Sequence, residues 1–158
     1  MKTFPFRLTV PVPRPASEWV EALLANTAGV LYAVDSGFDG SEPGEIRMID
    51  PAGVVTTPSA TWNGGNQDGT GTAATFTGPA GVASDAFGNV YVTDSNEIRK
   101  VTPAGVVTTL AGTVTAGSAN GLGSAASFDE PTGVAADPAG NLYVADSADK
   151  EIRKIAPH

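Results

Sequence analysis

The sequence contains no cysteine, a single histidine at position 158, and nine lysine and arginine residues against seventeen aspartate and glutamate residues. The absence of cysteine excludes disulfide bonds and thiolate metal sites within the chain. A net charge of −8 without a basic cluster argues against nucleic acid or an anionic membrane surface as a partner. No apolar stretch approaches the length of a membrane span, so we expect no membrane insertion.

The scarcity of histidine also limits the catalytic chemistry. A set of nucleophile, histidine and acid needs a positioned imidazole, and a lone histidine at the last residue does not provide one. We therefore expect that the chain is not an enzyme, has no catalytic or metal-binding residues, and uses no cofactor.

Glycine and proline are plentiful, with nineteen and twelve residues, whereas aromatic residues make up only 7% of the chain. This composition is typical of many short strands joined by tight turns. The hydrophobic fraction of 41% is near the value for globular proteins, so we expect a folded core.

The chain repeats itself at a shift of 52 residues. The heptapeptide Pro51–Thr57 recurs without change as Pro103–Thr109, and Gly65 to Val82 share nine further identities with Gly117 to Val134. A fixed period of this length indicates an array of similar supersecondary units, none of which buries its apolar face alone.

Each unit is predicted to be an antiparallel meander of short strands. The second copy predicts strands over 79–84, 89–94, 97–101 and 106–110, with turns between them. The third copy repeats the first three strands and stops before a fourth. The first copy repeats the strands at 29–36 and 45–49, with about seven extra residues, 37–43, in the turn between them. For the residues before these, the pattern leaves two alternatives, an inner strand or a helical turn over 17–24 with Ser17 as its N-cap.

A repeated four-stranded meander is the blade of a β-propeller. The stretch from Pro131 through Asn141-Leu142-Tyr143-Val144-Ala145-Asp146 to Ile152-Arg153-Lys154-Ile155 resembles the NHL repeat, a blade-forming family. The resemblance implies an all-β propeller with about three blades over 16–78, 79–130 and 131–158. Residues 1–15 then form a separate N-terminal strand and a proline-rich spacer. Some related propeller enzymes bind a metal through several histidines or through Glu, Asn and Asp, and this chain has no matching set.

Three blades do not close a ring of the usual four to eight. We expect the N-terminal strand to complete the third blade of a neighbouring molecule, because unpaired sheet edges are templates for another chain. Its assembly residues are Phe4, Phe6, Leu8 and Val10. Two chains would close a six-bladed homodimer, whereas a contact that does not close continues into a fibre. The alternatives are that this strand folds back on its own chain or is disordered.

Other candidate residues fall into three groups. An Asp on the second strand and an Arg on the third recur in every copy, which favours structural pairs bonding within each blade; they are Asp35, Asp94, Asp146, Arg47, Arg99 and Arg153. The inserted turn and a nearby tryptophan form a candidate contact loop; its residues are Phe38, Asp39, Glu42 and Trp62. The segment 66–71 resembles part of a calcium loop but lacks a bidentate glutamate, which favours an inter-blade turn.

The leading functional hypothesis is therefore a non-enzymatic structural protein that self-associates by strand exchange. The alternative is an extracellular propeller module that binds a protein or carbohydrate, and a hydrolase or lyase is the third hypothesis. The resemblance implies an extracellular or surface-associated location, although residues 4–10 lack the apolar core of a signal peptide.

Overall fold

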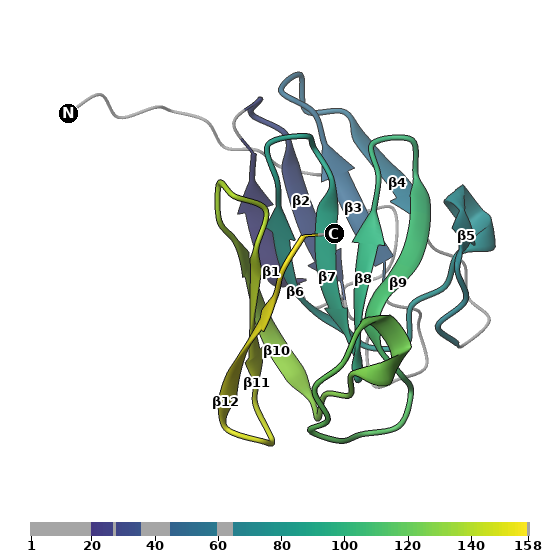
Figure 1. The fold of residues 1–158 in the computed structure, drawn as a ribbon. Helices are drawn as coiled ribbons and strands as arrows, with labels where there is room; N and C mark the ends of the chain where they lie inside the picture. The colour runs from purple at the N-terminus through teal and green to yellow at the C-terminus, as the bar shows by residue number, and fades with distance from the viewer. Residues whose placement is uncertain (1–19, 27, 36–44, 60–64, 158) are drawn as a thin grey trace.

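The chain forms three antiparallel sheets, which we call blades 1, 2 and 3 (Figure 1). The computed structural model describes residues 20–26, 28–35, 45–59 and 65–157. Blade 1 has the order β1-β2-β3-β4, blade 2 the order β5-β9-β8-β7-β6, and blade 3 the order β10-β11-β12. The prediction of an all-β propeller built from four-stranded antiparallel blades is confirmed; completion of the last blade by another chain involves residues outside the described ranges.

The strand bounds follow the repeat closely. Blade 1 consists of β1 (Val20–Ala25), β2 (Leu31–Asp35), β3 (Glu45–Ile49) and β4 (Val55–Ser59). Blade 2 consists of β5 (Gly69–Thr70), β6 (Pro79–Ser84), β7 (Val90–Asp94), β8 (Glu97–Val101) and β9 (Val106–Gly112). Blade 3 consists of β10 (Pro131–Ala136), β11 (Leu142–Asp146) and β12 (Glu151–Ile155).

The first long strand of each blade lies at the inner side, where neighbouring blades meet. β6 contacts both β1 and β10 (Figure 1). β1 is a strand in register with β2, with Leu23 opposite Ala33. Of the two alternatives that the sequence left open, the described residues 20–25 therefore adopt the strand, and residues 17–19 lie outside the described ranges.

An asparagine or aspartate side chain fixes the turn that follows each inner strand, and in blade 1 it is Asn26. Asp85 Oδ1 accepts hydrogen bonds from the amides of Phe87 and Asn89, both at 2.9 Å, and Gly88 adopts a φ of +82°. Such a turn favours glycine because its φ lies in the left-handed region. Asp137 makes the equivalent bonds in blade 3, so the turn recurs with the repeat.

The Asp85 turn also binds a tyrosine of the next strand. The Tyr91 hydroxyl donates to Asp85 Oδ2 at 3.0 Å. Burial, this hydrogen bond and the charge of Asp85 together raise the pKa of Tyr91 from 10.0 to about 12. A tyrosine whose pKa is raised on folding stabilises the protein fully below pH 10, and this contribution is lost as the pH rises toward 12.

We therefore expect the free energy of unfolding to fall between pH 10 and 12, and to fall less in a Tyr91→Phe variant. Urea titrations of both proteins across this range measure the difference. Equal pH slopes for the two proteins would contradict the assignment of this effect to Tyr91.

Two hydrophobic clusters lie between the blades. The first joins Tyr32, Val34 and Ile46 of blade 1 to Val90, Val92, Val101 and Val107 of blade 2. The second joins Tyr91, Ile98 and Ala111 of blade 2 to Leu142 and Val144 of blade 3. Each cluster also contains a phenylalanine, Phe76 or Phe128, from the segment that connects two blades.

The connecting segments were predicted only as turns, but each contains a short 3-10 helix. These are η1 (Gly71–Ala73) and η2 (Gly123–Ala125). Before η1, the two residues of β5 add to the outer edge of β9. Within the described residues, no helix is long and apolar enough to cross a membrane.

Candidate functional site

A buried ion pair organises the outer part of blade 2. Arg99 Nη1 donates to Asp94 Oδ2 at 3.2 Å, and both side chains are fully buried. Asp94 Oδ1 accepts the amides of Thr77 and Gly78 at 2.9 and 2.7 Å. Burial raises the pKa of the Asp94 carboxyl, while these amide bonds and the Arg99 charge act in the opposite direction. The pair thus ties the end of the connecting segment to the sheet.

The same arginine holds the start of the connecting segment. Arg99 Nη2 donates to Asp68 Oδ1 at 2.9 Å, and its guanidinium lies 5.4 Å from the centre of the Phe76 ring. Thr109 on β9 donates its hydroxyl to the same Asp68 oxygen at 3.0 Å. Asp68 therefore links β8 and β9 to the segment that carries β5.

Blade 3 repeats this arrangement with one substitution. Arg153 Nη1 donates to Asp146 Oδ2 at 3.0 Å, and Nη2 donates to Asn120 Oδ1 at 2.8 Å. Asn120 replaces Asp68, and the guanidinium lies 5.1 Å from the centre of the Phe128 ring. The structure therefore brings the predicted Asp and Arg together in blades 2 and 3, within single blades.

In blade 1 the Asp35 side chain is not among those that the structure describes, so the Asp–Arg pair is described for blades 2 and 3 alone. Arg47 Nη1 donates to the Thr57 hydroxyl at 3.3 Å. Asp35 ends β2 at the register position of Asp94 and Asp146, opposite Glu45. The assembly residues Phe4, Phe6, Leu8 and Val10 and the contact-loop residues Phe38, Asp39, Glu42 and Trp62 lie outside the described ranges.

In segment 66–71, side-chain oxygens of Asn66 and Asp68 accept hydrogen bonds from other side chains of the chain. Besides the bonds of Asp68, the Asn66 amide donates to Glu97 Oε2 at 2.7 Å, and Asn66 Oδ1 accepts the Thr77 hydroxyl. Over the described ranges, no three His, Asp or Glu side chains come together in a group able to hold a metal ion. This segment therefore acts as a connection between blades.

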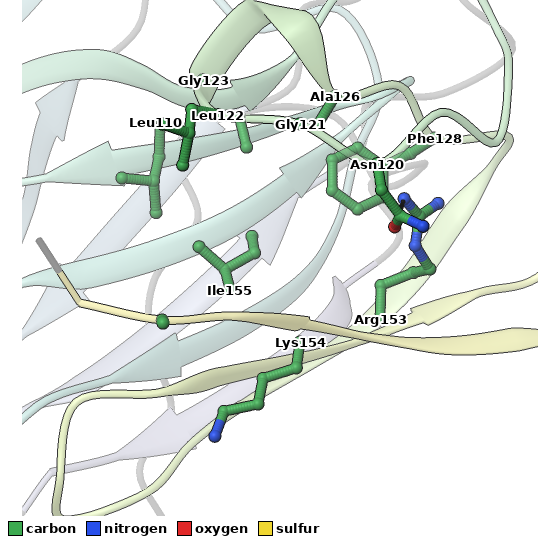
Figure 2. Close-up of a pocket in the computed structure, with 12 residues that line it drawn as sticks. Leu110, Asn120, Gly121, Leu122, Gly123, Ala126, Phe128, Arg153, Lys154 and Ile155 are labelled. Atoms are coloured by element: carbon green, nitrogen blue, oxygen red, sulfur yellow. Dashed lines mark hydrogen bonds between the residues drawn. The ribbon is translucent and has the colours of Figure 1, made fainter.

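A groove runs beside β12 in blade 3 (Figure 2). It has a volume of about 240 Å³ and lies between the connecting segment on one side and the end of blade 3 on the other. Figure 2 shows Ile155 pointing into it toward Leu110, whereas Lys154 points away. Its lining residues are Leu110, Ala111, Asn120, Gly121, Leu122, Gly123, Ala126, Phe128, Arg153, Lys154, Ile155 and Ala156.

The repeat explains what this groove corresponds to. In blade 2, β9 lies between β8 and β5. Gly121 and Leu122 are the counterparts of β5 at the 52-residue shift, and β12 is the counterpart of β8. Among the described strands, β12 pairs only with β11. The groove therefore occupies the place that β9 takes in blade 2.

Two family models together match residues 45–155 of the chain. A model described as the Teneurin NHL domain matches residues 45–129, and one described as the NHL repeat matches residues 128–155. Protein SUPPRESSOR OF QUENCHING 1, chloroplastic, of Arabidopsis thaliana is 39% identical over 94 residues, which are 58% of this chain and 9% of that protein.

Two solved structures have the same arrangement of blades. A structural genomics protein of unknown function from Bacteroides thetaiotaomicron is 28% identical with a TM-score of 0.73, over 85% of this chain and 34% of its own. An auxiliary nutrient binding protein from Bacteroides ovatus is 26% identical with a TM-score of 0.67, over 86% of this chain and 37% of its own. The chain thus spans less than a tenth of the Arabidopsis relative and little more than a third of each structure.

Proposed function

The chain belongs to the NHL-repeat family, and from this premise we propose that it is a non-enzymatic β-propeller module that self-associates by accepting a strand beside β12. The observation that carries the proposal is the groove in the place of β9. An unpaired strand edge with an adjacent apolar groove is the geometry that β-strand addition uses. The charged pairs at the recurring positions are engaged with each other and with backbone groups, which supports a structural role for them.

Blade 2 defines what the incoming strand must present. β9 is antiparallel to β8, with Val107 opposite Val101 and Thr109 opposite Arg99. Val107 is only 1% exposed, so it supplies the apolar anchor of that strand. In blade 3 the positions of Val101 and Arg99 are taken by Ile155 and Arg153. The groove therefore needs an apolar residue opposite Ile155, followed two residues later by one that tolerates Arg153.

Residues 3–10 of a second copy supply this pattern in the proposal. With Leu8 opposite Ile155, Val10 lies opposite Arg153, and Thr9 takes the outward position of Thr108. Pro11 then coincides with the irregular position after Thr109, where the register of β9 shifts. Proline is tolerated at such a bulge because its missing amide removes no ladder hydrogen bond there.

Deletion of residues 1–13 tests this proposal. We expect the full chain to have a solution mass of at least twice 15.9 kDa by light scattering, and the deletion variant to be monomeric. Leu8→Glu is expected to act like the deletion, whereas Thr9→Lys, on the opposite face of the strand, leaves the mass unchanged. A monomeric full chain, or a deletion variant of unchanged mass, would overturn strand exchange.

A second candidate function is ligand or protein binding by an extracellular propeller. It is supported by the similarity to the nutrient binding protein of Bacteroides ovatus. The loops at 37–43 and 62–70 are its candidate contacts. A shift of the thermal midpoint with an oligosaccharide or a peptide, abolished by Trp62→Ala, would support it over pure assembly.

A further inference from the structure

A tyrosine and an isoleucine recur on the same face of each blade. In blades 1 and 2 the pairs Tyr32–Ile46 and Tyr91–Ile98 are buried, with both tyrosines 8% and both isoleucines 0% exposed. In blade 3, Tyr143 is 37% and Ile152 72% exposed. The same two side chains are therefore core residues twice and surface residues once.

The inner strand of the following blade covers the two buried pairs. Val82 on β6 packs against the cluster that contains Tyr32 and Ile46, and β6 contacts β2. Val134 on β10 packs in the same way against the cluster of Tyr91 and Ile98, and β10 contacts β7. Each Tyr–Ile face thus receives a valine from the inner strand of the next blade.

Blade 1 carries the counterpart of these valines. Leu23 on β1 lies opposite Ala33, as Val82 lies opposite Val92 and Val134 opposite Val144. Leu23 is 68% exposed. The chain therefore presents both halves of its internal contact at the surface, the receiving face on blade 3 and the inserted residue on blade 1.

We propose that the Tyr143–Ile152 face of one copy packs against Leu23 on blade 1 of a second copy. This inference rests on the proposed self-association and names the surface that accompanies strand exchange. The exchanged strand and the Tyr143–Ile152 contact each join blade 3 of one molecule to the N-terminal part of another. A single junction between two molecules therefore contains both contacts. The junction is heterologous, because different surfaces meet, and two junctions close a ring of six blades.

A glycine on β10 marks the same surface. The inner strands of blades 2 and 3 approach so closely that a Cβ on Gly81 would lie 2.4 Å from the Thr132 carbonyl oxygen. Gly133 is the repeat counterpart of Gly81, and a Cβ there would meet only the Ala145 side chain, at 3.6 Å. In the proposed junction, the Glu21 carbonyl of the second copy takes the place that Thr132 takes beside Gly81.

Variants that introduce opposite charges on the two sides of the junction test the proposal. Ile152→Lys and Leu23→Glu are each expected to lower the light-scattering mass to that of a monomer, because each puts a charge into an apolar contact. A 1:1 mixture of the two variants is expected to recover the wild-type mass. In the mixture one junction pairs the new ammonium with the new carboxylate, and the other junction is wild type. Phe87→Lys is the matched control, since Phe87 is 86% exposed in the turn between β6 and β7 of blade 2 and belongs to neither half of the proposed contact.

Gly133→Ala supplies a second readout that leaves the exposed apolar residues intact. It is expected to weaken self-association about tenfold or more while the thermal midpoint of the monomer is unchanged. Wild-type mass in both single charge variants would overturn the junction while self-association stood. A mixture that stays monomeric would also overturn it. A monomeric wild-type chain would overturn the self-association on which the inference rests.

Discussion

Replacing Arg99 by methionine is expected to lower the free energy of unfolding by about 3–5 kcal/mol, because it leaves a buried carboxylate without its cation. Asp94 is fully buried, and its Oδ2 loses the guanidinium at 3.2 Å. Asp68 and the Thr75 carbonyl lose the guanidinium as a donor as well, so the segment that carries Phe76 loses its hydrogen bonds to Arg99. Urea unfolding monitored by circular dichroism measures the loss.

Two controls separate the ion pair from general damage to β8. Lys100→Met changes the neighbouring, half-buried residue and is expected to alter stability by about 0.5 kcal/mol at most. The double variant Asp94→Asn, Arg99→Met is expected to cost less than the sum of its single changes, because the fully buried Asp94 carboxylate is removed together with its cation. A loss of less than about 1 kcal/mol for Arg99→Met would contradict the argument.

The repeat in the sequence predicted most of the fold because each strand carries its own local signals. The alternation in residues 89–94 and 97–101 and the glycines of the flanking turns, Gly88 and Gly105, were enough to place β7 and β8 to within a residue. The start of β2 and the end of β9 were each misplaced by two residues, since β2 begins at Leu31 rather than Gly29 and β9 runs to Gly112 rather than Leu110. The pairing of Asp94 with Arg99 was also predicted, because a feature present in every copy indicates a contact within the blade.

The connecting segments and the groove could not be predicted from the sequence. Nothing local in Gly69–Thr70 predicts a strand, because β5 forms only through its pairing with β9. The hydrogen bond from Arg99 to Asp68 joins residues that are 31 positions apart in the sequence. The local sequence around Asp68 resembles part of a calcium loop, so it does not indicate this contact. One signal was available, since Asp68 and Asn120 occupy equivalent positions and both have an oxygen able to accept from arginine.

The exposure of Ile152 could not be predicted from the sequence repeat either. Ile46, Ile98 and Ile152 stand in the same local sequence, yet two are buried and one is exposed. The difference arises from the neighbouring blade rather than from the strand itself. For this reason the repeat predicts what each surface binds within the chain, whereas the structure is needed to identify which surfaces are left open.

Gly81→Ala is the second substitution for which we expect a large effect, a loss of about 3 kcal/mol in unfolding free energy. The added Cβ would lie 2.4 Å from the Thr132 carbonyl oxygen and 3.1 Å from the Thr93 hydroxyl oxygen. That hydroxyl accepts the Gly81 amide at 2.7 Å, so the side chain has no room to move aside without losing this bond. β6 and β10 must therefore separate, and the second hydrophobic cluster opens with them.

The same substitution at the repeat counterpart separates this clash from the general effect of replacing glycine. At Gly133 the nearest atom to an added Cβ is the Ala145 Cβ at 3.6 Å, an ordinary contact. Gly133→Ala is therefore expected to leave the stability of the monomer unchanged or slightly higher, because alanine loses less backbone entropy on folding. Urea unfolding of both variants compares identical chemistry at equivalent strand positions, so equal losses at the two sites would show that close packing of the inner strands does not set the cost.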